Sequence, residues 1–70
     1  MQRTPVTSST IISLGLQGTE MEVEFRNYNL YRYSHVPAEV FQAILTAESV
    51  GRAFDAIIKK NPQQYPFRKV

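Results

Sequence analysis

The chain has 70 residues, a formal net charge of +2 and no cysteine. This length suits one small domain over residues 1–70, and the lack of cysteine excludes disulfide bonds and thiolate zinc sites. No apolar run approaches the length of a membrane span and Met1–Thr10 has no signal-peptide pattern, so we expect a soluble, cytoplasmic protein without a membrane partner. Because so small a core is marginally stable, we also expect self-association, with a homodimer as the simplest form.

The first half of the chain predicts two strands joined by a tight turn. Residues 20–26 alternate glutamates with apolar side chains, a period of two that is typical of a half-buried strand, and residues 10–16 form the strand before it. Gly18-Thr19 between them predicts a two-residue type II′ hairpin loop. The register that follows places apolar pairs on one face: Leu16 with Met21, Leu14 with Val23, and Ile12 with Phe25.

A third strand is predicted over residues 30–34. The loop Asn27-Tyr28-Asn29 fits a three-residue hairpin with Asn29 in the left-handed conformation. The pairs that this turn predicts are Phe25 with Tyr31, Val23 with Tyr33, and Glu24 with Arg32 as an opposite-charge pair on the other face.

The second half predicts two amphipathic helices. Pro37, at the first helical position, begins a helix over residues 37–48, and Ser49 is the expected N-cap of a second helix over residues 50–60. Residues 63–70 are expected to form an extended tail that packs back on the domain. The predicted fold class is therefore α+β in the order β-β-β-α-α, a three-stranded antiparallel meander with both helices on one sheet face.

A set of marker residues in a fixed order spans nearly the whole chain. It runs through Ser8-Ser9, Ile12, Gly15, Val23, Phe25, Tyr31-Arg32-Tyr33, Val36-Pro37, Val40-Phe41, Leu45, Ala47, Ser49, Gly51, Phe54, Ile57 and Tyr65-Pro66-Phe67-Arg68. This ordered set resembles the KTSC domain family, which occurs at the C-terminus of some lysyl-tRNA synthetases and as stand-alone small proteins of bacteria and phages. The resemblance implies a stand-alone protein of this kind, with no established activity, no catalytic residues to carry over and a suggested link to RNA.

Five of these markers are interpreted as structural: Tyr31, Arg32, Tyr33, Pro37 and Gly51. The predicted register turns both tyrosines toward the helices, so it favours core packing of the rings over base stacking. Gly51 is expected at a tight corner between the two helices. Many relatives have a glycine where this chain has Asn29. Because asparagine tolerates the left-handed conformation, we expect this difference to have little effect.

The best candidate binding site combines cationic and aromatic residues of the second helix and the tail. Cations beside aromatic rings suit phosphate contact together with base stacking, so this set could bind RNA or another partner. Its members are Arg52, Lys59, Lys60, Tyr65, Phe67, Arg68 and Lys69. The alternative interpretation is a solvated helix end and tail, because cations also suit a helix C-terminus.

No pattern in the chain predicts catalysis, a metal site or a cofactor. The glutamates of residues 20–24 are expected to form a solvated strand face that repels phosphate, and His35 has no second imidazole or cysteine to join it. We therefore predict a non-enzymatic interaction module without a small-molecule substrate, acting through protein contacts or self-association. The alternative is an accessory RNA-binding domain, with tRNA as its expected ligand, that uses the basic second helix and tail.

Overall fold

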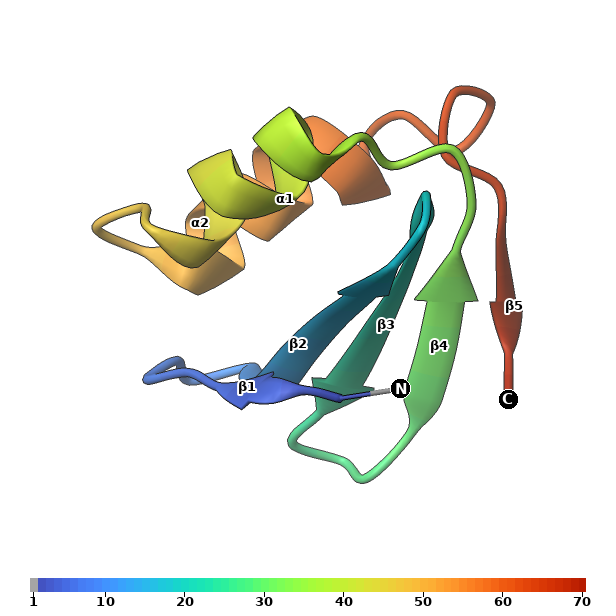
Figure 1. Cartoon of the computed structure of the whole chain (residues 1–70). Coiled ribbons are helices and arrows are strands. Elements are labelled where there is room, and N and C mark those ends of the chain that lie inside the picture. Colours follow the sequence, from blue (N-terminus) through green and yellow to red (C-terminus); the bar gives the residue numbers. More distant parts are fainter. Residues whose placement is uncertain (1) are drawn as a thin grey trace.

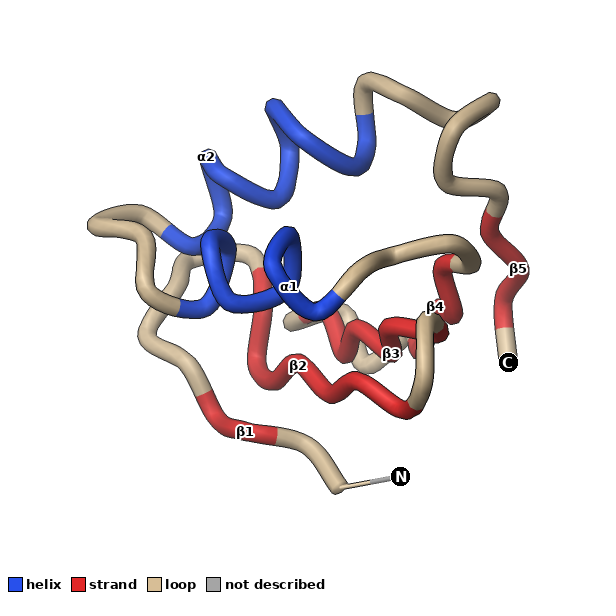
Figure 2. The backbone as a smooth tube through the Cα atoms, turned by 45° about the horizontal axis from the view of Figure 1, so that its top comes forward, coloured by secondary structure: helices blue, strands red, loops and turns tan. Residues whose placement is uncertain are grey.

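The structure, a computed structural model, describes residues 2–70. A five-stranded antiparallel sheet in the order β1-β2-β3-β4-β5 carries the helices on one face (Figures 1 and 2). The elements are β1 (Thr4–Pro5), β2 (Ile11–Gln17), β3 (Glu20–Phe25), β4 (Leu30–Tyr33), α1 (Ala38–Leu45), α2 (Val50–Phe54), the π-helical segment η1 (Asp55–Lys59) and β5 (Phe67–Lys69). The α+β class and the position of both helices on one face of the sheet confirm the prediction.

The predicted strand number was wrong, because the sheet has five strands and not three. The two additional strands lie at the edges: β1 pairs with β2, and β5 pairs with β4. Each has only two or three residues, too few for an alternating pattern to identify a strand in the sequence. The tail does pack back in extended form, and it does so as a strand of the sheet.

The first hairpin follows the predicted register over most of its length. Leu16 pairs with Met21 and Leu14 with Val23, and Gly18 has the positive φ of 63° that the type II′ loop needs. The predicted pair of Ile12 with Phe25 was wrong, because a β-bulge before Ser13 sets Ile11 opposite Phe25 instead. The extra residue lets Ile11 enter the core with no exposed surface, while Ile12 is only half-buried.

The second hairpin turns one residue earlier than predicted. Tyr28, not Asn29, has the left-handed backbone, with a φ of 67°, and the Phe25 N–H donates to the Asn29 carbonyl at 3.0 Å. A loop that begins one residue earlier shifts the register by two, so the predicted pairs across β3 and β4 were wrong. Met21 lies opposite Tyr33, Val23 opposite Tyr31 and Glu22 opposite Arg32. A shift of two keeps each side chain on its predicted face.

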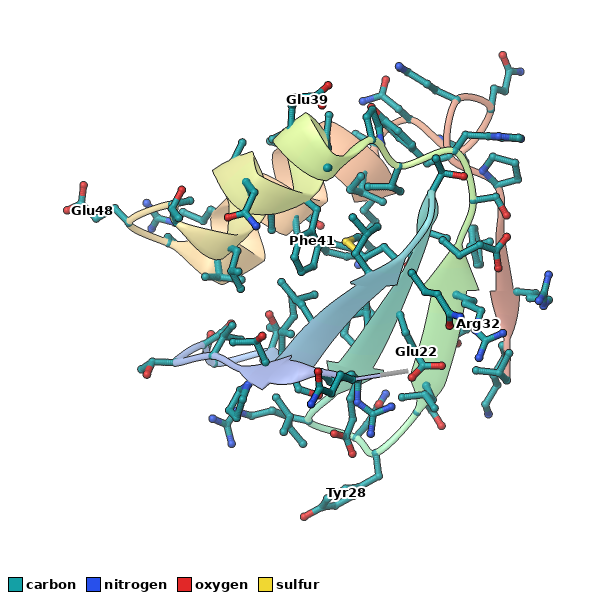
Figure 3. The ribbon with its side chains drawn as sticks, viewed as in Figure 1. Glu22, Tyr28, Arg32, Glu39, Phe41 and Glu48 are labelled. Atoms are coloured by element: carbon teal, nitrogen blue, oxygen red, sulfur yellow. The ribbon has the colours of Figure 1, made fainter. Side chains whose placement is uncertain are left out.

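Both helices begin near their predicted starts and α1 ends earlier than predicted. Pro37, with a ψ of 157°, is the residue before helix α1, which ends at Leu45. The Ser49 hydroxyl accepts from the Arg52 N–H at 3.4 Å, which confirms the predicted cap of α2. Phe41 points from α1 toward the sheet, whereas Glu39 and Glu48 point away from it (Figure 3).

The core lies between the helices and the inner face of the sheet. Its most deeply buried members come from every layer of the fold: Ile11, Leu14, Met21, Val23, Tyr33, Val36, Phe41, Ile44, Val50, Phe54, Ile58 and Tyr65. Within residues 2–70, no helix combines the length and apolar character needed to cross a bilayer.

Candidate binding surfaces

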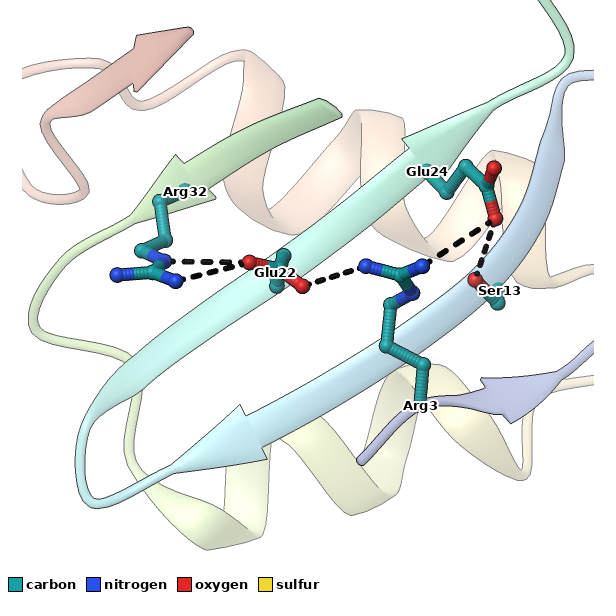
Figure 4. Close-up of polar contacts among 5 residues, drawn as sticks. All are labelled: Arg3, Ser13, Glu22, Glu24 and Arg32. Atoms are coloured by element: carbon teal, nitrogen blue, oxygen red, sulfur yellow. Dashed lines mark hydrogen bonds and ion pairs between the residues drawn. The ribbon is translucent and has the colours of Figure 1, made fainter. Parts of the chain in front are cut away.

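Ion pairs between arginines and the glutamates of β3 cover the outer face of the sheet, the face away from the helices. Glu22 in β3 is only 5% exposed and accepts from Arg3 at 2.6 Å and from Arg32 at 3.0 Å (Figure 4). Burial alone would raise the pKa of the Glu22 carboxyl, but the hydrogen bonds and charges of Arg32 and Arg3 outweigh burial and lower this pKa below its ordinary value of 4.5. The prediction of a solvated strand face was therefore wrong for Glu22.

Gly15 makes room for this arrangement. The strand register places Arg3, Gly15, Glu22 and Arg32 in one row across the sheet. A Cβ atom on Gly15 would lie 2.5 Å from the Gln2 carbonyl oxygen and 2.9 Å from the Arg3 Cγ. Because glycine has no side chain there, Arg3 reaches over it to the Glu22 carboxylate.

The other two glutamates of the outer face are paired as well. Glu24 accepts from the Ser13 hydroxyl at 3.1 Å, and Glu20 accepts from the Ser34 hydroxyl at 3.0 Å. Arg68 lies 3.7 Å from Glu20 and therefore belongs to this outer face. The sheet separates it from Arg52, Lys59 and Lys60, the predicted cations of the helical layer.

An apolar pocket of about 490 Å³ lies on the inner side of the sheet, between η1 and the strands β4 and β5. The Phe67 ring packs edge-to-face against Tyr31, with ring centroids 5.9 Å apart, and 5.4 Å from Tyr33, yet Phe67 remains 56% exposed. The pocket is lined by Phe25, Asn27, Tyr31, Tyr33, Ile58, Lys59, Pro62 and Phe67. We call this the β5 pocket.

A larger and more polar groove of about 840 Å³ adjoins the β5 pocket. The segment Thr7–Thr10 forms one wall and Arg26, Arg52 and Lys59 contribute three cations to its lining, together with Glu48 and Asp55. Phe25, Asn27 and Lys59 line both cavities, so the two are neighbours. We call this larger cavity the polar groove.

Gly51 lies at the polar groove and not at a corner between the helices. A Cβ atom at this position would lie 3.0 Å from the hydroxyl oxygens of both Ser8 and Thr10. The prediction that Gly51 lies at a corner between the two helices was therefore wrong. The glycine lets helix α2 approach the segment between β1 and β2.

The seven predicted site residues are spread over five parts of the molecule. Lys59 and Phe67 line the β5 pocket, with Lys69 opposite Tyr31 on the same side of the sheet, whereas Arg52 lines only the polar groove. Lys60 is exposed and lines neither cavity. Tyr65 is 5% exposed within the core and Arg68 is on the outer face, so neither residue belongs to the two cavities.

Several residues that line these cavities were not among the predicted site residues, and Arg26 and Pro62 are two of them. Arg26 lines the polar groove and donates to the Ser8 carbonyl at 2.8 Å, and Pro62 lines the β5 pocket. Arg26 is the last residue of the predicted strand 20–26, and its position there gives no indication of the groove it lines. Pro62 lies between the predicted helix 50–60 and the predicted tail 63–70, a position that gives no indication of the pocket it lines.

The two tyrosines of β4 pack against the core, as predicted. Tyr33 is buried against Phe54, with ring centroids 5.3 Å apart, and Tyr31 packs on Phe25. Burial, together with the neighbouring Tyr31, raises the pKa of Tyr33 to about 12. Across residues 2–70, no three acidic or histidine side chains gather in a way that could hold a metal ion.

Comparison with known families decides what kind of protein has this fold. The sequence model of the KTSC domain family matches residues 7–63, which cover most of the chain. The chain belongs to the KTSC domain family. A crystal structure of a KTSC domain protein from Yersinia pestis superimposes with a TM-score of 0.89 at 38% identity, covering 99% of this chain and 96% of that one. The resemblance inferred from the ordered marker residues is thereby confirmed.

Two curated relatives of this KTSC protein are also bacterial. An uncharacterised protein of Stutzerimonas stutzeri is 43% identical over 72 aligned positions, covering 100% of this chain and 99% of the relative. A protein of Tsukamurella paurometabola is 40% identical over 57 positions, covering 79% of this chain and 85% of the relative. These matches place the chain among KTSC proteins of uncharacterised function and indicate no enzyme family.

Proposed function

We propose that this KTSC protein is a non-enzymatic interaction module that binds another protein through the β5 pocket. The observation that carries the proposal is the exposed Phe67 ring beside the aromatic floor formed by Tyr31 and Tyr33. An apolar pocket with exposed aromatic walls on a small domain is typical of a protein-binding surface. The π-helical segment η1, which carries Lys59 at the pocket rim, supports this location because such segments are frequent at functional sites.

A site-specific photo-crosslinker tests this proposal. A benzophenone amino acid replaces Phe67 in one variant, and Glu39, which points away from the sheet on α1, in the control variant (Figure 3). After irradiation in a bacterial lysate, we expect discrete protein adducts from position 67 that excess wild-type protein suppresses. An adduct of twice the chain mass would identify a second copy as the partner. Adducts no different between positions 67 and 39 would contradict the proposal.

A second candidate function is RNA binding in the polar groove. Arg26, Arg52 and Lys59 line this groove, and the aromatic β5 pocket next to it could accept a base. Two observations weaken this candidate: Glu48 and Asp55 line the same groove, and Lys59 lies 3.8 Å from Asp55. The cations that remain free for phosphate are therefore few.

A titration of labelled bulk tRNA at several salt concentrations separates the two candidates. RNA binding in the groove predicts saturable binding that weakens with salt, with a log–log slope of about −0.7 per phosphate contact. Arg52→Glu should then abolish it, whereas Lys60→Glu, outside both cavities, should have a smaller effect. A protein-binding module predicts no saturable tRNA binding at physiological salt.

A further inference from the structure

We propose that strand β5 is a docking edge for an extended acidic peptide segment of a partner protein, which adds a sixth strand to the sheet and inserts one apolar side chain into the β5 pocket. This inference rests on the proposed function and names its partner chemistry. It combines three observations: free backbone groups on β5, the adjoining apolar pocket, and the sign of the charges around both.

The hydrogen-bond pattern determines which backbone groups of β5 are free. The Ser34 N–H donates to the Pro66 carbonyl at 2.8 Å, and the Val70 N–H donates to the Leu30 carbonyl at 2.8 Å. In an antiparallel pair, alternate residues direct both backbone groups at the partner strand, so Arg68 between these two also faces β4. The N–H and C=O groups of Phe67 and Lys69 therefore point to the open edge, where a peptide strand could pair with them.

The β5 pocket lies on the side of the sheet to which these two residues direct their side chains. Phe67 lies opposite Tyr33 and Lys69 opposite Tyr31, and both tyrosines line the pocket. In an added strand, the residue that pairs with Phe67 shares its face of the sheet. Its side chain would enter the pocket beside the Phe67 ring, and an apolar side chain of moderate size suits that lining.

The charges around the edge select an acidic partner. Among the described residues, Lys59 is the one charged side chain in the pocket lining, and it lies 3.8 Å from Asp55. Lys69, on the same side of the sheet and at the edge itself, is therefore the cation that an added strand would meet first. The residue that pairs with Lys69 lies two positions from the apolar anchor. Antiparallel addition, which matches the rest of the sheet, therefore predicts an acidic residue, then any residue, then the apolar anchor.

A second copy fits this edge poorly. Two β5 strands paired antiparallel about Arg68 would place one Arg68 directly opposite the other, and like charges opposite each other are destabilising. Cationic side chains on an edge strand are a common protection against such self-pairing. An acidic segment of another protein removes this repulsion, which is why we choose it over a second copy.

The test uses defined peptides and the full-length protein. The main probe is a fluorescein-labelled, capped eight-residue peptide of threonine and valine with one central Glu-Thr-Leu sequence. The controls are the same peptide with Lys-Thr-Leu, and two N-methylated versions. An N-methyl group on the leucine blocks a backbone N–H that faces β5, whereas one on the central threonine blocks an N–H that faces away.

We expect saturable binding of the Glu-Thr-Leu peptide and of its threonine-methylated version. The leucine-methylated peptide should bind about tenfold more weakly, and so should the main probe to the Phe67→Ala variant. Lys69→Glu should reverse the preference in favour of the Lys-Thr-Leu peptide. Lys60→Glu, with the same charge change on an exposed residue outside the pocket, should leave the preference in place. In the complex, amide exchange at Phe67 and Lys69 should slow.

Several results would overturn the inference. Equal affinity of both N-methylated peptides would exclude strand addition, and an unchanged preference in Lys69→Glu would exclude the charge selection. If position 67 crosslinks to a protein while no probe peptide binds, strand addition fails and the proposed function stands. If position 67 yields no specific adducts and tRNA binds instead, both fail in favour of RNA.

Discussion

At the scale of single residues, Gly15 is the position where the outer sheet face tolerates no side chain. A Cβ atom there would lie 2.5 Å from the backbone oxygen of Gln2 and 2.9 Å from Arg3. We expect Gly15→Ala to lower the free energy of unfolding by about 1–3 kcal/mol, measured by urea denaturation. In a chain that lacks residues 1–5, the same substitution should be close to neutral. Equal losses in both chains would show that the contact with the N-terminal segment is not the cause.

The carboxylate of Glu22 gives the stability of the domain a predictable dependence on pH. Its pKa in the folded state is below the ordinary value of 4.5, so the stability it contributes is complete above pH 4.5 and is lost as the pH falls through the lowered pKa. Glu22→Gln removes the charge that both arginines bind, so it should lower the free energy of unfolding at pH 7. The expected loss is only about 1–3 kcal/mol, because solvent screens the half-buried arginines on either side.

Thermal unfolding of both proteins between pH 7 and pH 3 tests this contribution. The wild type should lose more stability below pH 4.5 than Glu22→Gln does. The melting temperatures of the two proteins should therefore converge as the pH falls. Parallel pH profiles for the two proteins would mean that Glu22 titrates alike in the folded and unfolded chains.

At the scale of elements, the β3–β4 turn carries conformational strain at an exposed tyrosine. Tyr28 has a φ of 67° and is 81% exposed, so its left-handed backbone is not compensated by burial of the ring (Figure 3). Tyr28→Gly should raise the free energy of unfolding by about 0.5–1 kcal/mol, or the melting temperature by roughly 3–8 °C. Tyr28→Ala is the matched control, because it removes the ring and keeps the strain. A Tyr28→Gly protein no more stable than Tyr28→Ala would argue against the strain.

The two hairpins explain how far the sequence could specify the elements. Gly18 identifies the first turn because a glycine in a two-residue loop has few alternatives. The second loop offers Asn27 and Asn29, both tolerant of turn conformations, and the Asn27 side chain accepts from the Asn29 N–H at 3.0 Å. That local hydrogen bond fits a turn with Tyr28 in the left-handed position, an outcome that residue preferences alone do not predict. The edge strands β1 and β5 depend on partners distant in sequence.

At the scale of the whole molecule, the first strand β1 and the last strand β5 form the two edges of the sheet. Because the edge strands are placed by partners elsewhere in the chain, the sequence could predict only part of the site. Lys59 was placed by a strong helical pattern, and it does line the β5 pocket with Phe67. Arg68 was grouped with them, yet it faces the other side, because the face of a residue in β5 depends on a register with β4 that the sequence does not encode locally. Tyr65 lies just before β5, and its burial in the core likewise depends on residues distant in sequence.

Strand β5 also protects the edge of β4, and its removal should change how the molecule associates. A chain that ends at Pro66 would leave Leu30–Tyr33 as an open edge, with Tyr31 and Tyr33 on one face and Arg32 as its single charge. Such an edge is prone to pair with another copy. We expect this truncated chain to form dimers or larger species in sedimentation velocity at concentrations where the full-length chain sediments as a smaller particle.

A full-length Arg68→Ser/Lys69→Ser variant keeps strand β5 without its charges, so it separates the effect of strand cover from that of repulsion. If the truncated chain sediments like the full-length protein at every concentration, β5 does not protect the sheet edge from association. Its structural role is then limited to the packing of Phe67 against Tyr31 and Tyr33.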